Sequence, residues 1–453
     1  MIGAVQRGRD GALGLLVAAM TACGGGGGGS SEPLPTIPAG MLRDPSAWAF
    51  VPRPGRDVEC ALGTDCGRSF VNVLAWAARW DEPGLFPDLT ETVDVNSDHD
   101  VVTLACALAW RGTEEEAWRE RARLLLEVAV STPYSPTGVS ALRPGRNLLS
   151  YVLAADTIEL AALDPVLDGA FRVWIEQIAE FDVYSGDGVT AGTFRTYHEQ
   201  RPNNVGVVVG AARVAVDMYL GGPVHARHLN DAARVLRGYL GDRSAYVFPR
   251  GAFGGGGEDD SWQADRARPI GVGAPGARIA GLDLDVDGCL PEEMRRLGAL
   301  DCLACGAVPS VACYNRADAL DGGLPPGISA TNYPWEALQG LVMQAYLLWR
   351  CGFDCFAWED AAIERTHRFL YVTYGIRAQD TWSDPTQGDD PGCCDGVSNR
   401  AQVDDTWVPH VVACLYGSSF LEGELVYGGK PGKNCGFADW WMLGVTPPSP
   451  PQR

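Results

Sequence analysis

The sequence predicts an all-α fold of the α/α toroid type, an incomplete barrel of helical hairpins with long irregular loops. Apolar residues recur at helical spacing in successive segments between positions 100 and 415. These segments come in pairs joined by short connections, and no half of the chain is rich in the alternating pattern of strands. No sequence repeat of fixed period favours an open solenoid instead.

Three predicted hairpins occupy the first half of the body. They pair positions 100–110 with 113–130, 147–160 with 165–181, and 203–220 with 226–240. In the first hairpin, Thr113 and Glu116 form a capping box that opens the second helix. In the second, Asp164 is the expected N-cap and Pro165 takes the first helical position. Both helices of the third hairpin end at glycines, which favour a helix C-terminus.

Positions 246–332 interrupt this pattern. The segment is rich in Gly, Pro and Asp, which predicts long loops with few regular elements. Loops of such length in a compact domain are usually functional. Helical spacing resumes over 335–350, 359–374 and 404–415, so the loops at one end of the ring are expected to form a cleft.

The N-terminus predicts export and lipid attachment. Arg7 and Arg9 precede an apolar run over 12–20, and Thr21-Ala22 stands directly before Cys23, as in a secretory signal peptide. The apolar run is too short to remain as a membrane-spanning helix. The last residues of this segment resemble a lipobox, the signal of bacterial lipoproteins, so Cys23 is expected to carry the lipid.

The chain is therefore divided into four parts. They are a signal peptide over 1–22, a Gly/Ser/Pro-rich tether over 23–40, the toroid over 41–445 and a Pro-rich tail over 446–453. Gly24 stands where an aspartate favours inner-membrane retention, so the resemblance to lipoproteins implies the outer membrane, with the face left open.

Charge and cysteine content narrow the partners. The net charge of -21 disfavours nucleic acid and an anionic membrane surface, and a polyanionic substrate would require a locally basic cleft. Thirteen cysteines besides Cys23 suit an oxidising compartment, and their odd number leaves one unpaired in a monomer, which we expect to be a buried Cys106. Local disulfides are preferred to zinc for the cysteines that lie close in sequence, which are Cys60 with Cys66, Cys302 with Cys305 and Cys313, Cys351 with Cys355, and Cys393 with Cys394.

Three polar segments carry the candidate chemistry. Positions 197–204 place Asn203 and Asn204 directly before an apolar helix, where either residue is also a good N-cap. Positions 287–296 read Asp-Gly-Cys-Leu-Pro-Glu-Glu-Met-Arg-Arg, and Tyr333 stands at the mouth of the helix that follows the long loops.

Together these segments resemble the alginate lyase family and the wider superfamily of chondroitin AC and alginate lyases. That family has an Asn-Asn pair opening a helix, then a DG-x-LP-x-E-M-x-R stretch, then a Tyr three residues before an ALQ-x-LV helix. The resemblance implies an α/α toroid that cleaves a uronic-acid-containing polysaccharide, alginate-like or glucuronan-like, by β-elimination. It implies no cofactor and no metal.

The resemblance also implies roles for individual residues. Asn204, with Asn203 and Arg296, would hold the uronate carboxylate as charge moves onto it in the transition state. Tyr333 would act as base, as acid or as both. The family places a histidine base after the Asn pair, but Val205 stands there, so His198 is the candidate auxiliary base.

An insertion over 297–331 separates Arg296 from Tyr333, which are close in sequence in the family, and this insertion is a candidate flap over the cleft. Trp262, Trp335 and Arg201 are the candidate substrate-binding residues. The two tryptophans are chosen because flat aromatic faces stack on sugar rings. Arg146 is either a cleft cation or a surface charge.

Three other interpretations remain open. Positions 283–288 look like the start of a calcium loop, but Met294 replaces the bidentate glutamate that such a loop requires. Carboxylates between Glu258 and Asp265 would suit a glycoside hydrolase on a similar toroid. The absence of the family histidine at Val205 would suit a lipid-anchored glycan-binding protein without catalysis.

Overall fold

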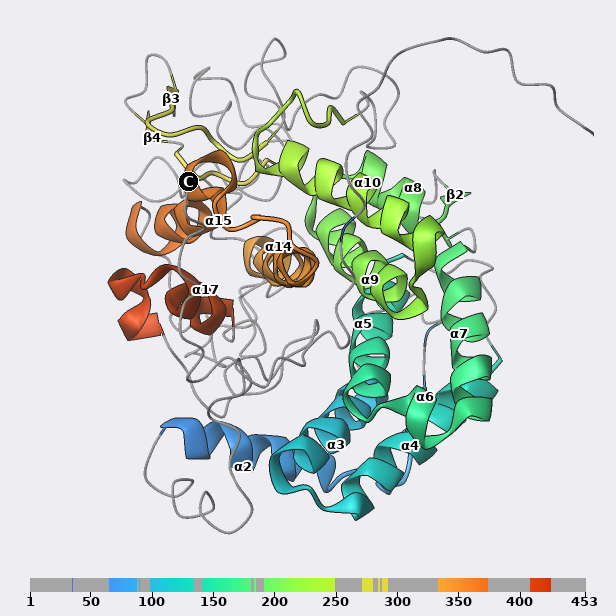
Figure 1. Cartoon of the computed structure of the whole chain (residues 1–453). Coiled ribbons are helices and arrows are strands. Elements are labelled where there is room, and N and C mark those ends of the chain that lie inside the picture. The colour runs from blue at the N-terminus through green and yellow to red at the C-terminus, as the bar shows by residue number, and fades with distance from the viewer. Residues whose placement is uncertain are drawn as a thin grey trace, which may run out of the picture. The chain divides into compact units, whose positions relative to one another are not determined.

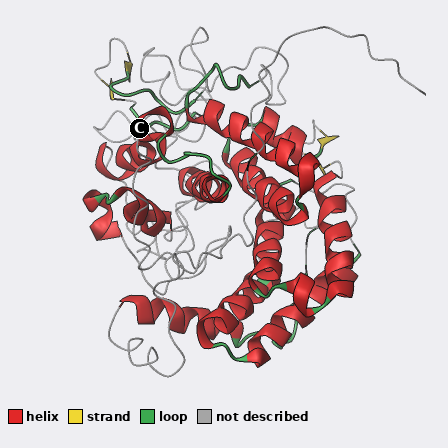
Figure 2. Ribbon diagram, in the orientation of Figure 1, coloured by secondary structure: helices red, strands yellow, loops and turns green. Residues whose placement is uncertain are grey.

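The structure, a computed structural model, describes residues 35, 65–87, 89, 98–133, 141–180, 183–184, 191–248, 271–279, 284–285, 287–291, 333–373 and 408–424. Helices dominate these residues (Figure 2). The strands among them form two-residue pairs, β1 (Val183–Tyr184) with β2 (Ala191–Gly192) and β3 (Arg278–Ile279) with β4 (Leu284–Asp285), both antiparallel. The prediction of an all-α fold is confirmed.

The longer helices lie in two rows (Figure 1). The inner row consists of α3 (His99–Thr113), α5 (Leu142–Thr157), α9 (Asn204–Leu220) and α14 (Tyr333–Arg350). The outer row consists of α4 (Glu116–Ser131), α7 (Pro165–Glu180), α10 (Gly222–Leu240) and α15 (Trp358–Arg368). Each inner helix packs against the next inner helix and is followed along the chain by an outer one. Toroids are built from such hairpins, while closure of the row into a ring stays a prediction.

Shorter elements connect and flank the two rows. They are α2 (Asp65–Ala77), which packs on α3, α6 (Leu160–Leu163), α8 (Phe194–Gln200), the π-helical turn η2 (Phe369–Thr373), α17 (Val408–Tyr416) and the 3-10 turn η4 (Ser419–Glu424). No described helix combines the length and the apolar composition needed to cross a membrane.

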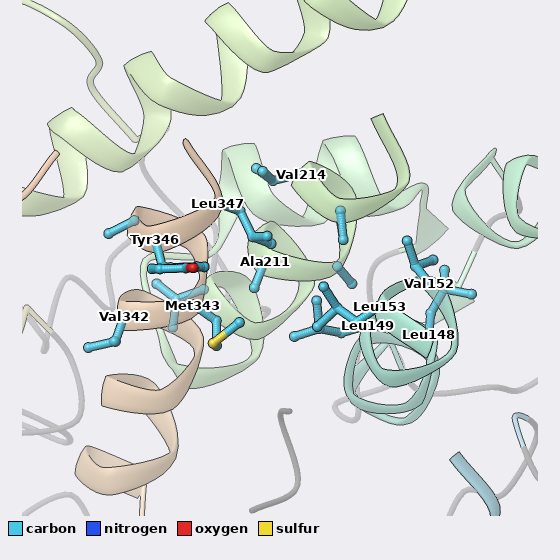
Figure 3. Packing of buried hydrophobic residues seen from close by; sticks show 14 of the residues in the cluster. Leu148, Leu149, Val152, Leu153, Ala211, Val214, Val342, Met343, Tyr346 and Leu347 are labelled. Atoms are coloured by element: carbon cyan, nitrogen blue, oxygen red, sulfur yellow. The ribbon is translucent and has the colours of Figure 1, made fainter. Parts of the chain in front are cut away.

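The core between α5, α9 and α14 is built from apolar side chains, with Met343 and Tyr346 among aliphatic residues (Figure 3). Gly340 on α14 lies so close to α9 that an added Cβ would meet the backbone nitrogen of Val208 at 2.6 Å. Gly145 on α5 is equally crowded, because its Cβ would lie 2.9 Å from a methyl group of Val209. These glycines let three inner helices approach closely, so polar groups at their N-terminal ends can reach one another.

Most predicted helix ends are confirmed, and one capping prediction is wrong. Asp164 caps α7, with its carboxylate accepting the Leu167 amide at 3.0 Å. Thr113, however, is the last residue of α3, where its hydroxyl donates to the Ala109 carbonyl at 2.9 Å. Residue 115 is the N-cap of α4 and makes no side-chain cap bond, so the capping box does not form. The Thr113 hydroxyl instead accepts the amide of Glu115 at 3.2 Å, one residue before α4 begins, and not the amide of Glu116 as a capping box requires.

Four cysteines have side chains that the structure describes as free thiols, and they are Cys106, Cys289, Cys351 and Cys355. Cys106 is a buried free thiol, as predicted, and burial raises its pKa to about 12. Cys351 and Cys355 are also free and buried, so the local disulfide predicted between them is wrong. Burial raises the pKa of both thiols, which pack as small apolar groups. The other disulfides predicted from sequence involve cysteines whose side chains are not described, and these are Cys60, Cys66, Cys302, Cys305, Cys313, Cys393 and Cys394.

Candidate functional site

A group of buried polar residues, here called the polar cluster, gathers near the N-terminal ends of the inner helices. Its members are Asp100 from α3, Arg143, Arg146, Asn147 and Ser150 from α5, Asn204 from α9, and Glu336 from α14. Buried polar groups require partners, because an unpaired one loses its hydration without compensation. The partners here come from different helices, so the cluster depends on the tertiary fold.

Glu336 is the centre of one half of the polar cluster. Its carboxylate forms an ion pair with Arg146 and accepts a hydrogen bond from Nδ2 of Asn204 at 2.8 Å. The residue is only 1% exposed and belongs to the first turn of α14, where the helix dipole favours a negative charge. Glu336 therefore fixes both a guanidinium and an amide in defined orientations.

The other half of the polar cluster is centred on Asp100. This carboxyl group accepts a hydrogen bond from Ser150 and lies near Arg143, and Ser150 lies two turns after Arg143 on the same face of α5. Burial raises the pKa of Asp100 to about 7, against the opposing effects of Ser150 and Arg143. A carboxylic acid that titrates near neutrality is a candidate proton carrier.

A histidine and a tyrosine lie beside Asp100. Nδ1 of His99 is 2.8 Å from the hydroxyl of Tyr151, and both side chains are buried. Burial lowers the pKa of His99 to about 4, so this imidazole is neutral at physiological pH.

Among the described residues, more buried arginines than buried carboxyl groups lie at this end of the inner row. Arg143, Arg146 and Arg201 are all buried, and they outnumber the carboxyl groups of Asp100 and Glu336. The excess grows when Asp100 is protonated. In a protein with a net charge of -21, this local group of arginines is of the sign that a polyanionic substrate would require.

Asn203 and Asn204 have different tasks. Oδ1 of Asn203 accepts the Gly206 amide at 2.9 Å, so Asn203 is the N-cap of α9. Asn204 is the first helical residue, and its amide donates to Glu336. The turn also requires Gly206, since an added Cβ would lie 1.7 Å from the carbonyl oxygen of Arg201.

His198 is enclosed between Arg213 and Gln344. Arg213 Nη1 lies 3.3 Å from His198 Nδ1, and the Gln344 amide lies 2.8 Å from Nε2. Arg213 can only donate, so Nδ1 of His198 accepts and Nε2 of His198 carries the proton. The amide of Gln344 is therefore assigned with its oxygen toward Nε2–H. This assignment also gives that oxygen a hydrogen-bond partner, which it otherwise lacks.

Burial, with the charge of Arg213, lowers the pKa of His198 well below its usual value. The imidazole is therefore neutral, 2% exposed and occupied at both nitrogens. Gly210 is needed beside it, because a Cβ there would approach the ring to 2.6 Å. These contacts favour a structural role for His198 over the role of auxiliary base.

The remaining predicted site residues have different positions. Tyr333 is the first residue of α14, one helical turn before Glu336, and its side chain is not described. Arg296, Trp262 and Cys23 lie outside the described residues.

Trp335 and Arg201 are described, and both are buried. Trp335 is 1% exposed within the hydrophobic core, so its ring cannot stack on a sugar in this structure, which contradicts that prediction. Adjacent residues of a helix project about 100° apart, so Trp335 packs in the core while Glu336 reaches the polar cluster. Arg201 is buried with its guanidinium 5.6 Å from the ring centre of Tyr197.

Sequence reasoning missed Asp100, Arg143 and Glu336, and it left Arg146 undecided between cleft and surface. Glu336 stands inside the apolar stretch Pro-Trp-Glu-Ala-Leu, whereas Asp100, Arg143 and Arg146 stand where apolar helices begin. Such residues are rarely buried unless they are paired, so this pattern was the available signal. Arg146 is buried, which excludes the surface alternative.

Neither protein-family models nor curated proteins match this chain. The resemblance to the alginate lyase family therefore depends on the short segments around Asn204, Asp287 and Tyr333. The activity that it implies is a proposal.

Proposed function

We propose that this protein is a polysaccharide lyase that cleaves a uronic-acid-containing glycan by β-elimination. The observation that carries the proposal is the contact of Glu336 with Arg146 and Asn204. It places a cation and an amide beside the start of α14, where Tyr333 lies one turn away. These are the residue types that elimination next to a carboxylate requires.

The reaction needs a stabilised carboxylate first. Removing the C5 proton of a uronate moves negative charge onto its carboxylate, so donors must be oriented before the charge develops. Asn204 and Arg146 supply an amide and a guanidinium, and a guanidinium matches a carboxylate with two parallel hydrogen bonds. Glu336 acts as a positioning residue, because its carboxylate contacts both groups.

A base and an acid complete the reaction. The phenolate of Tyr333 takes the C5 proton, the electron pair of the C–H bond forms the C4–C5 double bond, and the C4–O4 bond breaks. O4 leaves with a proton that the resulting phenol returns. The scheme requires Tyr333 as the phenolate, and a neighbouring cation would favour that form. His198 has no role in this scheme, since both of its nitrogens are occupied.

The proposal includes the location inferred from the N-terminus. A lipid on Cys23 and the tether up to position 40 would hold the enzyme at the outer membrane. Glycan fragments would then be released close to the cell.

The test uses the full chain in detergent with alginates, glucuronan and glycosaminoglycans. Elimination creates a double bond conjugated to the uronate carboxylate, which absorbs in the near ultraviolet, and hydrolysis does not. Tyr333→Phe should reduce turnover by about 10²- to 10⁴-fold with little change in substrate binding. Tyr219→Phe makes the same chemical change near the opposite end of α9 and should leave turnover near the parent value.

Two other outcomes would change the assignment. New reducing ends without ultraviolet absorbance would refute the lyase and favour a glycoside hydrolase. Asp100 gives that alternative a physical basis, because a buried carboxyl group with a pKa of about 7 has the property of a general acid. Glycan binding without either signal would favour a binding protein. Full activity of Tyr333→Phe would remove Tyr333 from catalysis.

A further inference from the structure

Asp217, His225 and His228 meet at the turn between α9 and α10, and we call them the His–Asp site. Nδ1 of His225 lies 2.8 Å from Oδ1 of Asp217, and Nδ1 of His228 lies 3.2 Å from the same oxygen. One ligand atom from each residue lies within 4.8 Å of the other two. The site is separate from the polar cluster, because Asn204 lies thirteen residues earlier on α9, or about 20 Å along the helix axis.

The local fold explains why these side chains converge. His225 and His228 are three residues apart in the first turns of α10, so they lie on one face of that helix. Asp217 lies in the last turn of α9. Gly221 and Gly222, with φ of 68° and 81°, reverse the chain in a left-handed conformation and bring the start of α10 over Asp217.

These two histidines are the accessible ones. The structure describes all six histidines of the chain, and four of them, His99, His198, His367 and His410, are at most 5% exposed. The side chains of His225 and His228 are 19% and 20% exposed. A solvated ion can therefore reach imidazole nitrogens at this turn, with a buried carboxylate already beside them.

Two arginines shape the charge of the site. Arg213 Nε lies 4.0 Å from the second carboxylate oxygen of Asp217. Nη2 of Arg195, from α8, lies 3.0 Å from Nε2 of His228 and 3.1 Å from its Nδ1, the proposed ligand atom, and 3.4 Å from Glu180. Arg195 opposes a bound cation, but its side chain is 36% exposed and exposed Glu180 offers it another partner. Arg195 therefore competes with a metal ion without permanently blocking it.

We propose that Asp217, His225 and His228 bind a divalent transition-metal ion of the zinc type. Two imidazole nitrogens and one carboxylate oxygen are a ligand set suited to zinc, with a fourth position left for water. Binding through Nδ1 moves each imidazole proton to Nε2, and Nε2–H of His228 then no longer accepts from Arg195. The ion ties the end of α9 to the start of α10 and stabilises this hairpin.

The test begins with the full chain stripped of metal by a chelator and titrated with Zn²⁺ by calorimetry and thermal unfolding. We expect one ion at this turn and a higher unfolding midpoint when it is bound. His225→Gln and Asp217→Asn should each weaken binding at least about tenfold. Asp81→Asn makes the same charge change at an exposed position just after α2, outside the α9–α10 hairpin, and should leave binding unchanged.

Arg195→Gln keeps all three ligands and should tighten binding, which separates loss of a ligand from loss of folding. Co²⁺ provides a spectroscopic probe, because imidazole and carboxylate ligation lacks the intense thiolate charge-transfer bands of a cysteine site. Absence of Zn²⁺ binding would overturn the proposal. Binding that is insensitive to His225→Gln and Arg195→Gln, or that shows thiolate bands with Co²⁺, would also overturn it.

Discussion

Replacing Glu336 with glutamine tests whether the polar cluster is held together by this carboxylate. Glutamine has nearly the same shape but offers one acceptor oxygen, whereas Glu336 serves both Arg146 and Asn204. Whichever donor loses that oxygen then faces an amide NH₂ group, and Arg146 keeps a buried charge without its counterion. Removing one partner of a buried ion pair costs about 3–5 kcal/mol, so Glu336→Gln should lower the free energy of unfolding by this amount.

Urea denaturation of parent and variant measures the change as a lower midpoint at an unchanged slope. Glu120→Gln is the matched control, because Glu120 pairs with Arg123 while being 53% exposed. Loss of such a surface pair should cost less than about 1 kcal/mol. A Glu336→Gln variant that is also within about 1 kcal/mol of the parent would refute the reasoning.

A second variant separates charge from packing. Arg146→Met combined with Glu336→Gln removes both charges while keeping an acceptor for Asn204. This double variant should be more stable than Glu336→Gln alone, since no unpaired charge remains buried. Equal or lower stability of the double variant would mean that packing around Arg146, and not charge pairing, dominates.

Two further predictions follow from buried positions. Gly210→Ala should destabilise the protein by about 1–3 kcal/mol, because its methyl group would meet the His198 ring. Gly169→Ala on α7 should stabilise it by about 0.5–1 kcal/mol, because no atom lies within 4 Å of the added Cβ. Thermal unfolding midpoints that shift in the same direction for both variants would contradict this. Asp100 stays protonated in the folded state up to a pKa of about 7 but ionises near 3.8 when unfolded, so its contribution to stability is lost as pH rises through 7. Urea midpoints of Asp100→Asn relative to the parent should therefore increase between pH values of about 4 and 7 and then level off, and a constant difference would count against the raised pKa.

Local patterns determined most of the helices. The periods over 100–110 and 203–220 correspond to α3 and α9, and Asp164 caps α7 as expected, because periodicity and capping depend on neighbours within one or two turns. Short helices escaped this reasoning. In α8 (Phe194–Gln200) seven residues are too few to show a period, and its cap comes from Thr193, whose side chain accepts the Thr196 amide.

Long-range contacts decided what the site residues do. Sequence spacing identified Asn203 and Asn204 as a pair. It could not show that Asn203 caps α9 while Asn204 donates to Glu336, because Glu336 lies 132 residues away from Asn204. The burial of Trp335 likewise depends on which helices cover α14.

The sequence by itself determined an all-α chain of helical hairpins, because helical periodicity depends only on residues that are close together in the chain. Only the tertiary structure decided that Arg146 and Glu336, 190 residues apart, form a buried pair and that Asp217 meets two histidines across a glycine turn. The physical reason is that such pairs gain their energy from burial and alignment, which exist once distant helices have packed together.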